Sequence, residues 1–455
     1  MKKTLKVALV LLLALAMVVN IAACGSSGSK DAEVSNSDKT SDASESNKTE
    51  GTEKKEPVTL KIATYWVGTL PEAPFFKSLV EEFPKTELGE GVTIEVEEIP
   101  GADTYAQKIK LLISSGDLPD IIQATGANYL DLAVQSGKIA DLTPYFDADP
   151  EWKGLFDPKA LEYNSRDGKI YAVPYTKEVC VMFYNKEMFQ KAGIEKFPET
   201  WDEFFQACEK LKAAGITPLS MDTAEYAWFT SLLLCSMIGT NGDAGNAWMN
   251  TQFPTDYNTP EVISAFANVQ KLLKEYTTND AVGANWVIPT NHFEKEETAM
   301  VANGPWMIPD FMDETKVSEG FYEKVGVAPF PGQGIIMVPQ FGEMIGAKDK
   351  AKIEAAVNFE KFKTSKEKQI EYMRTTGNLY ESPNIPIPED IIKDNPLLGE
   401  LIEISNNAKT TYGENQAFWY PNTLDALSNL LPDLAFGKIS PEEICQKLTE
   451  TANRN

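Results

Sequence analysis

Residues 59–66 read TLKIATYW and residues 92–99 read VTIEVEEI, and this pair of segments decides the fold class. In both segments apolar side chains alternate with polar ones, as is typical of β-strands that are half buried. Between them, residues 74–83 carry apolar side chains at helical spacing. An order of strand, helix and strand predicts an α/β fold.

Helix start signals recur along the rest of the chain. Thr200 and Glu203 form a capping box ahead of an amphipathic run, and Thr259-Pro260 and Ser440-Pro441 open two further helices. Residues 104–121, TYAQKIKLLISSGDLPDI, predict a helix that leads into a buried strand. These signals describe the scaffold and carry no information about a ligand.

The first residues have the pattern of a secretory signal. Lys2, Lys3 and Lys6 precede an apolar run over residues 7–19, which is too short to cross a bilayer. The small residues before Cys24 resemble the bacterial lipobox, so we expect residues 1–23 to be a signal peptide and Cys24 to carry lipid. Residues 24–56 are almost entirely polar, which predicts a disordered tether.

Composition excludes several classes of function. The net charge of −25 argues against a nucleic-acid surface. The chain has a single histidine, His292, and no G-x-S-x-G or phosphate-binding glycine motif, so neither triad hydrolysis nor nucleotide binding is indicated. The widely spaced cysteines favour buried free thiols over a disulfide framework; they are Cys180, Cys208, Cys235 and Cys445.

Six stretches carry a resemblance to a known family. They are SSGDLPDI, SGKIADLTPY, DGKIYAVPYTKEVCVMFYNKEMFQKAGI, FPETWDEF, ETAMVANGPWM and QAFWY. Their order resembles that of the family 1 extracellular solute-binding proteins, to which maltose-binding protein belongs. The resemblance implies a two-lobed periplasmic-binding-protein-like fold of type II, with a hinge and an interlobe cleft.

The resemblance also implies domain limits. Lobe 1 is expected to comprise residues 57–176 and 328–380, and lobe 2 residues 177–327 and 381–455. Three crossings of the chain between the lobes are expected near residues 175–179, 325–331 and 377–386, where several prolines occur.

The implied function is that of a carbohydrate-binding lipoprotein without catalytic activity or cofactor. By cleft closure it would deliver a mono- or oligosaccharide to the permease subunits of an ABC importer. It would work as a monomer, held by its lipid at the extracytoplasmic face of the cell membrane.

A sugar presents apolar ring faces and a rim of hydroxyl groups, which suit aromatic platforms and carboxylates or amides. Trp306 and Trp419 match tryptophans that stack on sugar rings in the family, although either could instead fill a gap in its lobe. Glu178 matches a hydroxyl acceptor at the first hinge and could equally be a solvated carboxylate. In contrast, Trp248 and Trp286 are expected to be mainly structural.

Six further candidates complete the expected site. Asp222, Glu225 and Trp228 lie in MDTAEYAWFT, the loop after a core strand. Trp66 and Asn128 follow strand ends, where open α/β sheets bind ligands, and Glu343 lies in a strand entry flanked by glycine. Residues 123–128 lack the aromatic and charged ligands of maltose-binding protein, which disfavours maltodextrin.

Two other functions stay open at this stage. A secreted glycoside hydrolase needs only two carboxylates at a suitable separation, and the chain has 67 acidic residues. A binding protein for a non-sugar solute is the second alternative, since an acidic cleft would suit a polyamine.

Overall fold

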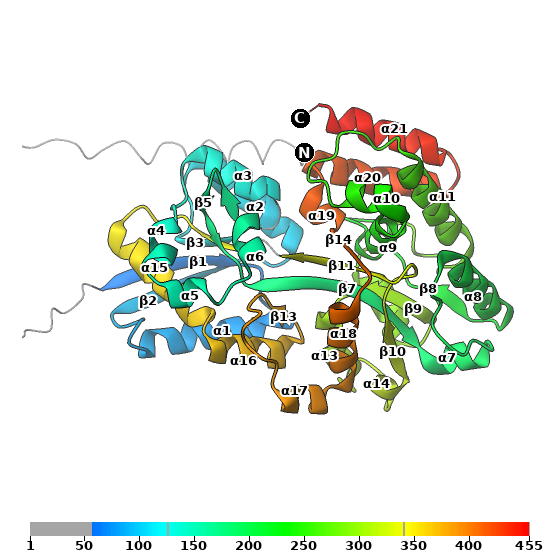
Figure 1. Ribbon diagram of the computed structural model, residues 1–455, viewed down its shortest axis with the longest axis horizontal. Helices are drawn as coiled ribbons and strands as arrows, with labels where there is room; N and C mark the ends of the chain where they lie inside the picture. The colour runs from blue at the N-terminus through cyan, green and yellow to red at the C-terminus, as the bar shows by residue number, and fades with distance from the viewer. Residues whose placement is uncertain (1–56, 125–126, 340–341, 455) are drawn as a thin grey trace, which may run out of the picture. The chain divides into compact units, whose positions relative to one another are not determined.

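The computed structural model describes residues 57–124, 127–339 and 342–454. The chain divides into two units after Lys54, and every described residue belongs to the second. This unit contains two larger β-sheets, each with helices on both faces (Figure 1). Each sheet has its own hydrophobic cores, so the unit has two α/β lobes.

The first sheet has the strand order β2-β1-β3-β12-β6. Its strands are β2 (Val92–Glu98), β1 (Val58–Thr64), β3 (Ile121–Gln123), β12 (Glu343–Ile345) and β6 (Ala172–Val173). β1 pairs in parallel with β2 and β3, and β12 runs antiparallel to β3 and β6. The two strands expected from the alternating pattern are β1 and β2.

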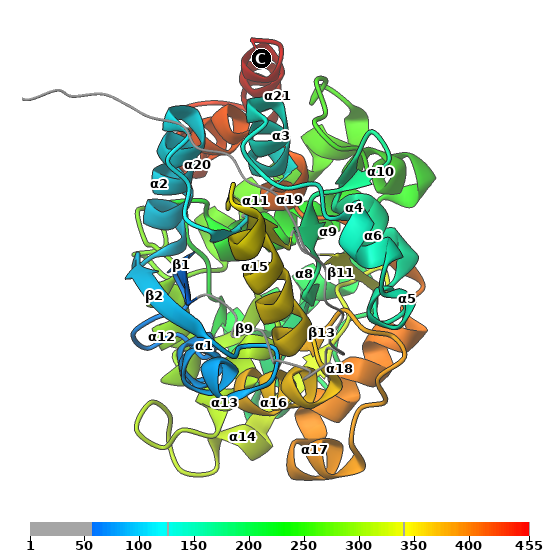
Figure 2. The same cartoon turned by 90° about the vertical axis from the view of Figure 1, so that its left-hand side faces the viewer.

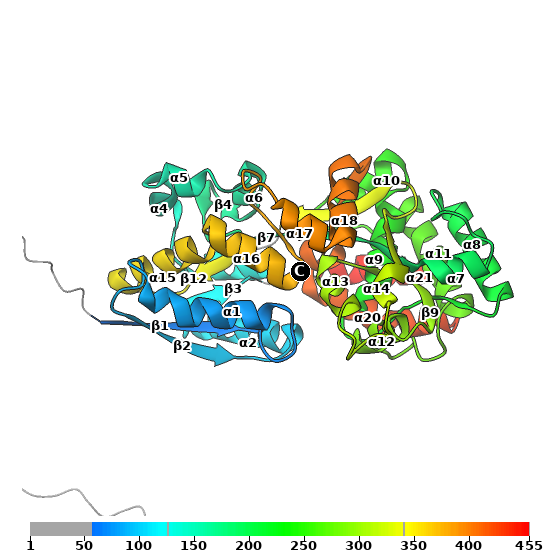
Figure 3. The same cartoon turned by 90° about the horizontal axis from the view of Figure 1, so that it is seen from below.

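Helices cover both faces of this sheet. Leu60 and Ile62 of β1 pack in one core, whereas Ala63 packs in another, as the alternation of side chains along a strand requires. The first core is covered by α1 (Glu72–Glu82), α15 (Lys350–Lys363) and α16 (Lys366–Thr376), which lie side by side (Figures 2 and 3). The second is covered by α2 (Ala102–Ser115) and α3 (Ala127–Ser136).

The second sheet is built on one long strand, β7 (Thr176–Asn185). Val179, Val181 and Phe183 pack in one core, and Cys180 and Met182 in another. Both faces of β7 are therefore apolar, which explains why its sequence does not alternate. The other strands of this sheet are β14 (Thr410–Tyr412), β11 (Gly334–Pro339), β9 (Thr298–Asn303), β8 (Thr217–Leu219), β10 (Val325–Ala328) and β13 (Leu379–Tyr380); β11, β9, β10 and β13 pair with β7 itself.

The helix starts of the second lobe are confirmed. Thr200 and Glu203 form a reciprocal capping box at α8 (Trp201–Ala213), and Ser440 and Glu443 form another at α21 (Pro441–Ala452). Thr259 caps α11 (Pro260–Glu275). The other large helices here are α9 (Trp228–Gly239), α10 (Gly242–Met249), α12 (Val287–Glu294), α18 (Pro396–Asn407) and α20 (Pro421–Ala435).

The remaining elements are short. They are η1 (Phe83–Lys85), α4 (Thr143–Asp147), α5 (Pro150–Lys153), α6 (Pro158–Tyr163), β4 (Ser165–Arg166), β5 (Lys169–Ile170), α7 (Lys186–Lys191), η2 (Pro305–Met307), α13 (Ile308–Phe311), α14 (Phe321–Lys324), α17 (Glu389–Asp394) and α19 (Asn415–Phe418). None of the helices in the described ranges combines the length and the apolar character needed to cross a membrane.

The chain passes between the two sheets three times. The passages run from β6 to β7, from β11 to β12 and from α16 to β13. Because β10 and β11 both pair with β7, the second passage comes after β11, later than the expected residues 325–331. The residue limits of the two lobes remain a prediction.

The cysteines of the described ranges are free and buried, which confirms the expectation from their spacing. Cys180 and Cys235 pack with the second-lobe core, as do Cys208 and Cys445. Burial raises the pKa of the Cys180 thiol well above its ordinary value, so this side chain behaves as a small apolar group.

Candidate ligand-binding cleft

Two adjoining cavities lie between the lobes. The larger, which we call the main cavity, has a volume of about 730 Å³ and is lined by residues 69–71, the start of α2, residues 222–229 and α12. The smaller, which we call the floor cavity, has a volume of about 330 Å³ and reaches the first residues of β7. Leu70, Trp228 and Trp306 line both cavities, so the two form one continuous cleft.

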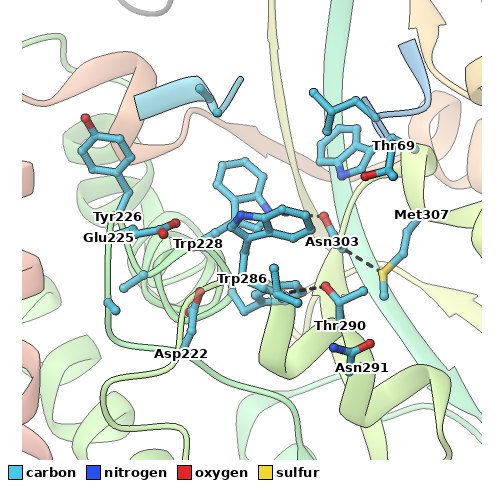
Figure 4. A pocket seen from close by; sticks show the side chains of 18 of the residues that line it. Thr69, Asp222, Glu225, Tyr226, Trp228, Trp286, Thr290, Asn291, Asn303 and Met307 are labelled. Atoms are coloured by element: carbon cyan, nitrogen blue, oxygen red, sulfur yellow. Dashed lines mark hydrogen bonds between the residues drawn. The ribbon is translucent and has the colours of Figure 1, made fainter. Parts of the chain in front are cut away.

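Trp228 and Trp306 form an aromatic pair where the cavities meet. Their ring centroids lie 6.1 Å apart and the ring planes are inclined by 46°. Trp228 begins α9, and its indole Nε1 donates to Oδ1 of Asn303 at 3.1 Å, which fixes the ring (Figure 4). Both rings are partly exposed to the cleft, so they present flat apolar faces to a guest.

The segment before Trp306 explains how its ring is held. Pro305 starts the short helix η2, and Gly304 lies directly against the indole. A Cβ atom at Gly304 would lie 2.2 Å from that ring, so only glycine permits this close approach. Gly304 and Pro305 therefore hold the Trp306 ring in place, as the Gly-Pro sequence before it predicts.

The loop before α9 has an unusual backbone. Glu225 and Ala227 both have positive φ angles, 55° and 48°, which residues with a Cβ rarely adopt. Strained backbone of this kind persists where surrounding contacts hold it, and it is concentrated at functional sites. Here the Ser428 hydroxyl donates to the carbonyl of Glu225, and the amide of Ala224 donates to Ala284.

Asp222 lies at the base of this loop and lines the main cavity. Its Oδ1 accepts from the amide of Thr230 at 3.2 Å, whereas its Oδ2 has no hydrogen-bond partner among the described residues. Burial raises the pKa of this carboxyl to about 7, against the opposing effect of the backbone hydrogen bonds. An unpartnered buried oxygen beside a cavity is available to a ligand hydroxyl.

Carboxylates and amides line the floor cavity. Glu178 on β7 and Glu414 ahead of α19 are both buried there, and Glu414 caps α19 through the amides of Gln416 and Ala417. Burial and the neighbouring charge of Glu178 hold the pKa of Glu414 well above its ordinary value. The floor therefore offers both acceptors and a protonated carboxyl group that can donate.

Trp66 forms part of the wall of the floor cavity on the first lobe. Tyr372 stacks on it, with ring centroids 5.9 Å apart and planes inclined by 24°. The Lys363 ammonium lies 4.9 Å from the Trp66 ring and 4.3 Å from that of Tyr175. These contacts lock the Trp66 ring in one orientation.

Glu343 does not reach the cleft. Its Oε1 forms a buried ion pair with Lys363 at 2.7 Å, and the side chains are 10% and 1% exposed. Burial opposes ionisation, but the Lys363 charge outweighs it and lowers the pKa of Glu343. The strand entry places this carboxylate inside the lobe, so its expected role as a hydroxyl acceptor is corrected to a structural one.

Trp419 also lies away from both cavities. Its side chain is 1% exposed, and Tyr257 and Trp248 meet it edge to face at centroid distances of 4.9 and 5.8 Å. The expected stacking platform is therefore part of the second-lobe core in this structure. Asn128 lies at the start of α3, but its side chain is outside the described residues, as is the whole of Cys24.

Three cleft residues were not expected from the sequence. Trp286 lines the main cavity and is 48% exposed, although its sequence context indicated a structural role. Glu294 lines the same cavity, and burial together with nearby Asp310 raises its pKa to about 7. Glu414 is the third. Nothing in the local sequence separates these two acids from the rest of the 67 acidic residues, because their position depends on how distant segments meet.

Comparison with known proteins decides the family. A family model described as "Bacterial extracellular solute-binding protein" matches residues 78–399. The chain belongs to this family. Among solved structures, a chitin oligosaccharide binding protein is similar over 88% of this chain and 98% of its own, with a TM-score of 0.79 and 22% identity. That likeness supports the two-lobed fold.

Two curated relatives match over part of their length. The multiple sugar-binding protein of Streptococcus mutans is 27% identical over 270 residues, 56% of this chain and 59% of that protein. The sn-glycerol-3-phosphate-binding periplasmic protein of Brucella abortus is 30% identical over 132 residues, 28% of this chain and 30% of that protein. These relatives are binding proteins, in keeping with the solute-binding family.

Proposed function

We propose that this solute-binding protein binds a saccharide in the interlobe cleft and delivers it to an ABC importer without chemical change. The observation that carries the proposal is the arrangement around Trp228 and Trp306. Two partly exposed indoles lie at the junction of the cavities, with the carboxylates of Asp222 and Glu178 on the walls. Flat apolar faces next to hydroxyl acceptors match the two kinds of surface that a sugar presents.

Closure of the cleft supplies the mechanism. Residues 69–71 and the start of α2 come from the first lobe, whereas Asp222, Trp228 and Trp306 come from the second. A ligand that contacts both lobes binds the closed form more tightly than the open form. This difference in affinity shifts the equilibrium of the protein toward the closed form. The three passages between the sheets provide the hinge.

We further propose that Cys24 is acylated after removal of residues 1–23, and that residues 24–56 tether the lobes to the extracytoplasmic face of the membrane. The small residues before Cys24 and the polar composition of the tether support this. The likeness to the S. mutans sugar-binding protein supports a permease as partner. The protein is expected to act as a monomer, with no cofactor.

A phosphorylated polyol is the second candidate, because the glycerol-phosphate-binding relative points to it. The described cleft favours the neutral sugar. Lys177, Lys295 and Lys316 line it, but acidic groups outnumber them, including Glu72, Glu178, Asp222, Glu225, Glu294 and Glu414. Arginine, the side chain best matched to phosphate, is absent from the described cavity walls.

Isothermal titration calorimetry of the purified protein tests the proposal. The panel contains malto-, xylo- and chito-oligosaccharides, with spermidine and glycerol 3-phosphate as charged comparators. We expect at least one saccharide to bind and to be recovered intact by chromatography after long incubation. Binding of a charged comparator with no saccharide response would overturn the sugar assignment, and cleavage of the saccharide would overturn the claim that the protein only binds.

A further inference from the structure

The aromatic rings of the cleft are distributed over its whole length. Trp66 lines only the floor cavity, Trp228 and Trp306 line both cavities, and Trp286 lines only the main cavity. Trp66 stacks on Tyr372 and Trp228 is paired with Trp306, but Trp286 has no ring partner among the described residues. The four indoles are thus distributed over both cavities, with the Trp228–Trp306 pair between Trp66 and Trp286 in this order of lining.

Trp286 is 48% exposed, which is unusual for so large an apolar side chain. Val287 and Ile288 follow it at 39% and 37% exposure, so an apolar patch lies at the start of α12. An apolar patch at the edge of a cavity is typical of a binding surface. Figure 4 shows Trp286 near Trp228 on the second-lobe wall of the main cavity.

The backbone that carries Trp286 is firmly held. The amide of Val287 donates to Oδ1 of Asn285, and the Thr290 hydroxyl donates to the carbonyl of Trp286 at 2.8 Å. The carbonyl of Ala284, two residues before Trp286, accepts from the amides of Thr223 and Ala224 in the strained loop next to Asp222. The backbone under the indole is thus fixed before a ligand arrives, which lowers the entropy lost on binding.

We infer that Trp286 forms an outer subsite, and that the ligand is an oligosaccharide of at least three sugar units whose outermost unit stacks on this indole. This inference rests on the proposed function and adds the length of the saccharide to it. The middle unit lies at the Trp228–Trp306 pair, and the innermost unit lies in the floor cavity beside Trp66.

The test compares ligand length with the Trp286→Ala variant. The saccharide series found to bind the unaltered protein is titrated from the disaccharide to the hexasaccharide by calorimetry. We expect Trp286→Ala to raise Kd about tenfold for the longer members, as for the loss of one stacking contact, with little change for the disaccharide. Trp286→Phe should restore most of the affinity.

Phe436→Ala is the matched control, since Phe436 is 64% exposed and lines neither cavity. An equal loss of affinity for every length, or no loss for any, would overturn the outer subsite while the sugar-binding function stands. If the apolar patch at Trp286 instead docks another protein, Trp286→Ala would leave the affinity for every saccharide unchanged. Failure of the unaltered protein to bind any saccharide would instead refute the proposed function itself.

Discussion

Substitution of Lys363 by methionine tests how the wall of the cleft is supported. Lys363 is buried between Glu343, at 2.7 Å, and the rings of Trp66 and Tyr175. A second carboxyl group, that of Glu360, is fully buried beside Glu343. Burial and the Glu343 charge hold the pKa of Glu360 well above its ordinary value, so the cluster is neutral overall.

Methionine keeps the volume of the stem but leaves the Glu343 carboxylate buried without a counter-charge. Breaking a buried ion pair in this way costs about 3–5 kcal/mol. Glu343 can instead become neutral by binding a proton. For a carboxylate with an ordinary pKa of about 4.3, protonation costs about 3.7 kcal/mol at pH 7 and about 1 kcal/mol at pH 5. The pKa of Glu343 in the folded variant is then raised, so its stability falls as the pH rises.

Urea unfolding followed by tryptophan fluorescence measures this loss. We expect Lys363→Met to lose about 3–4 kcal/mol at pH 7 but only about 1 kcal/mol at pH 5. The double variant Lys363→Met/Glu343→Gln should be close to the unaltered protein at both values. A loss below about 1 kcal/mol at pH 7, or a loss that does not depend on pH, would refute the reasoning.

Three further predictions concern the cleft and its surroundings. Trp306→Ala should weaken saccharide binding by about 1–3 kcal/mol in a calorimetric titration, whereas an unchanged Kd would remove this platform. Trp419→Ala should instead lower the free energy of unfolding by about 3–5 kcal/mol, as for an aromatic core residue. A variant that keeps its stability but loses saccharide binding would contradict the placement of Trp419 in the second-lobe core. Because burial raises the pKa of Asp222 to about 7, its protonated form stabilises the fold at low pH, and this contribution is lost as the pH rises from about 4 to about 7. Asp222→Asn should lessen this slope in a series of urea unfolding curves, with the part due to Glu294 remaining. An unaltered slope would show that Asp222 does not titrate there.

The fold could be predicted well from local patterns. The alternation around Leu60 and Ile62 and the capping boxes at Thr200 and Ser440 are properties of a few consecutive residues, and the structure confirms both. The second passage between the sheets was predicted too early because prolines at residues 329 and 331 indicate irregular backbone. Pairing of β11 with β7, which no local signal shows, keeps this segment in the second sheet.

The cleft was predicted only in part. Trp228 and Trp306 occur in short sequence contexts that fix the ring, and the structure brings them together with Trp66, Glu178, Asp222 and Glu225 along the cavity walls. The sequence could not separate the exposed Trp286 from the buried Trp419, since each lies at the end of a helix, α12 and α19 respectively. Only the packing of distant elements determines which indole faces a cavity.

Fluorine NMR of the protein labelled with 5-fluorotryptophan tests the central claim most directly. The eight tryptophans give eight separate probes, which single Trp→Phe variants assign. On addition of a bound saccharide we expect the resonances of Trp228 and Trp306 to move most, while those of the buried Trp152 and the half-buried Trp201, on helices outside the cleft, stay in place. Movement of the latter pair, with Trp228 and Trp306 unaffected, would show that the sugar binds elsewhere.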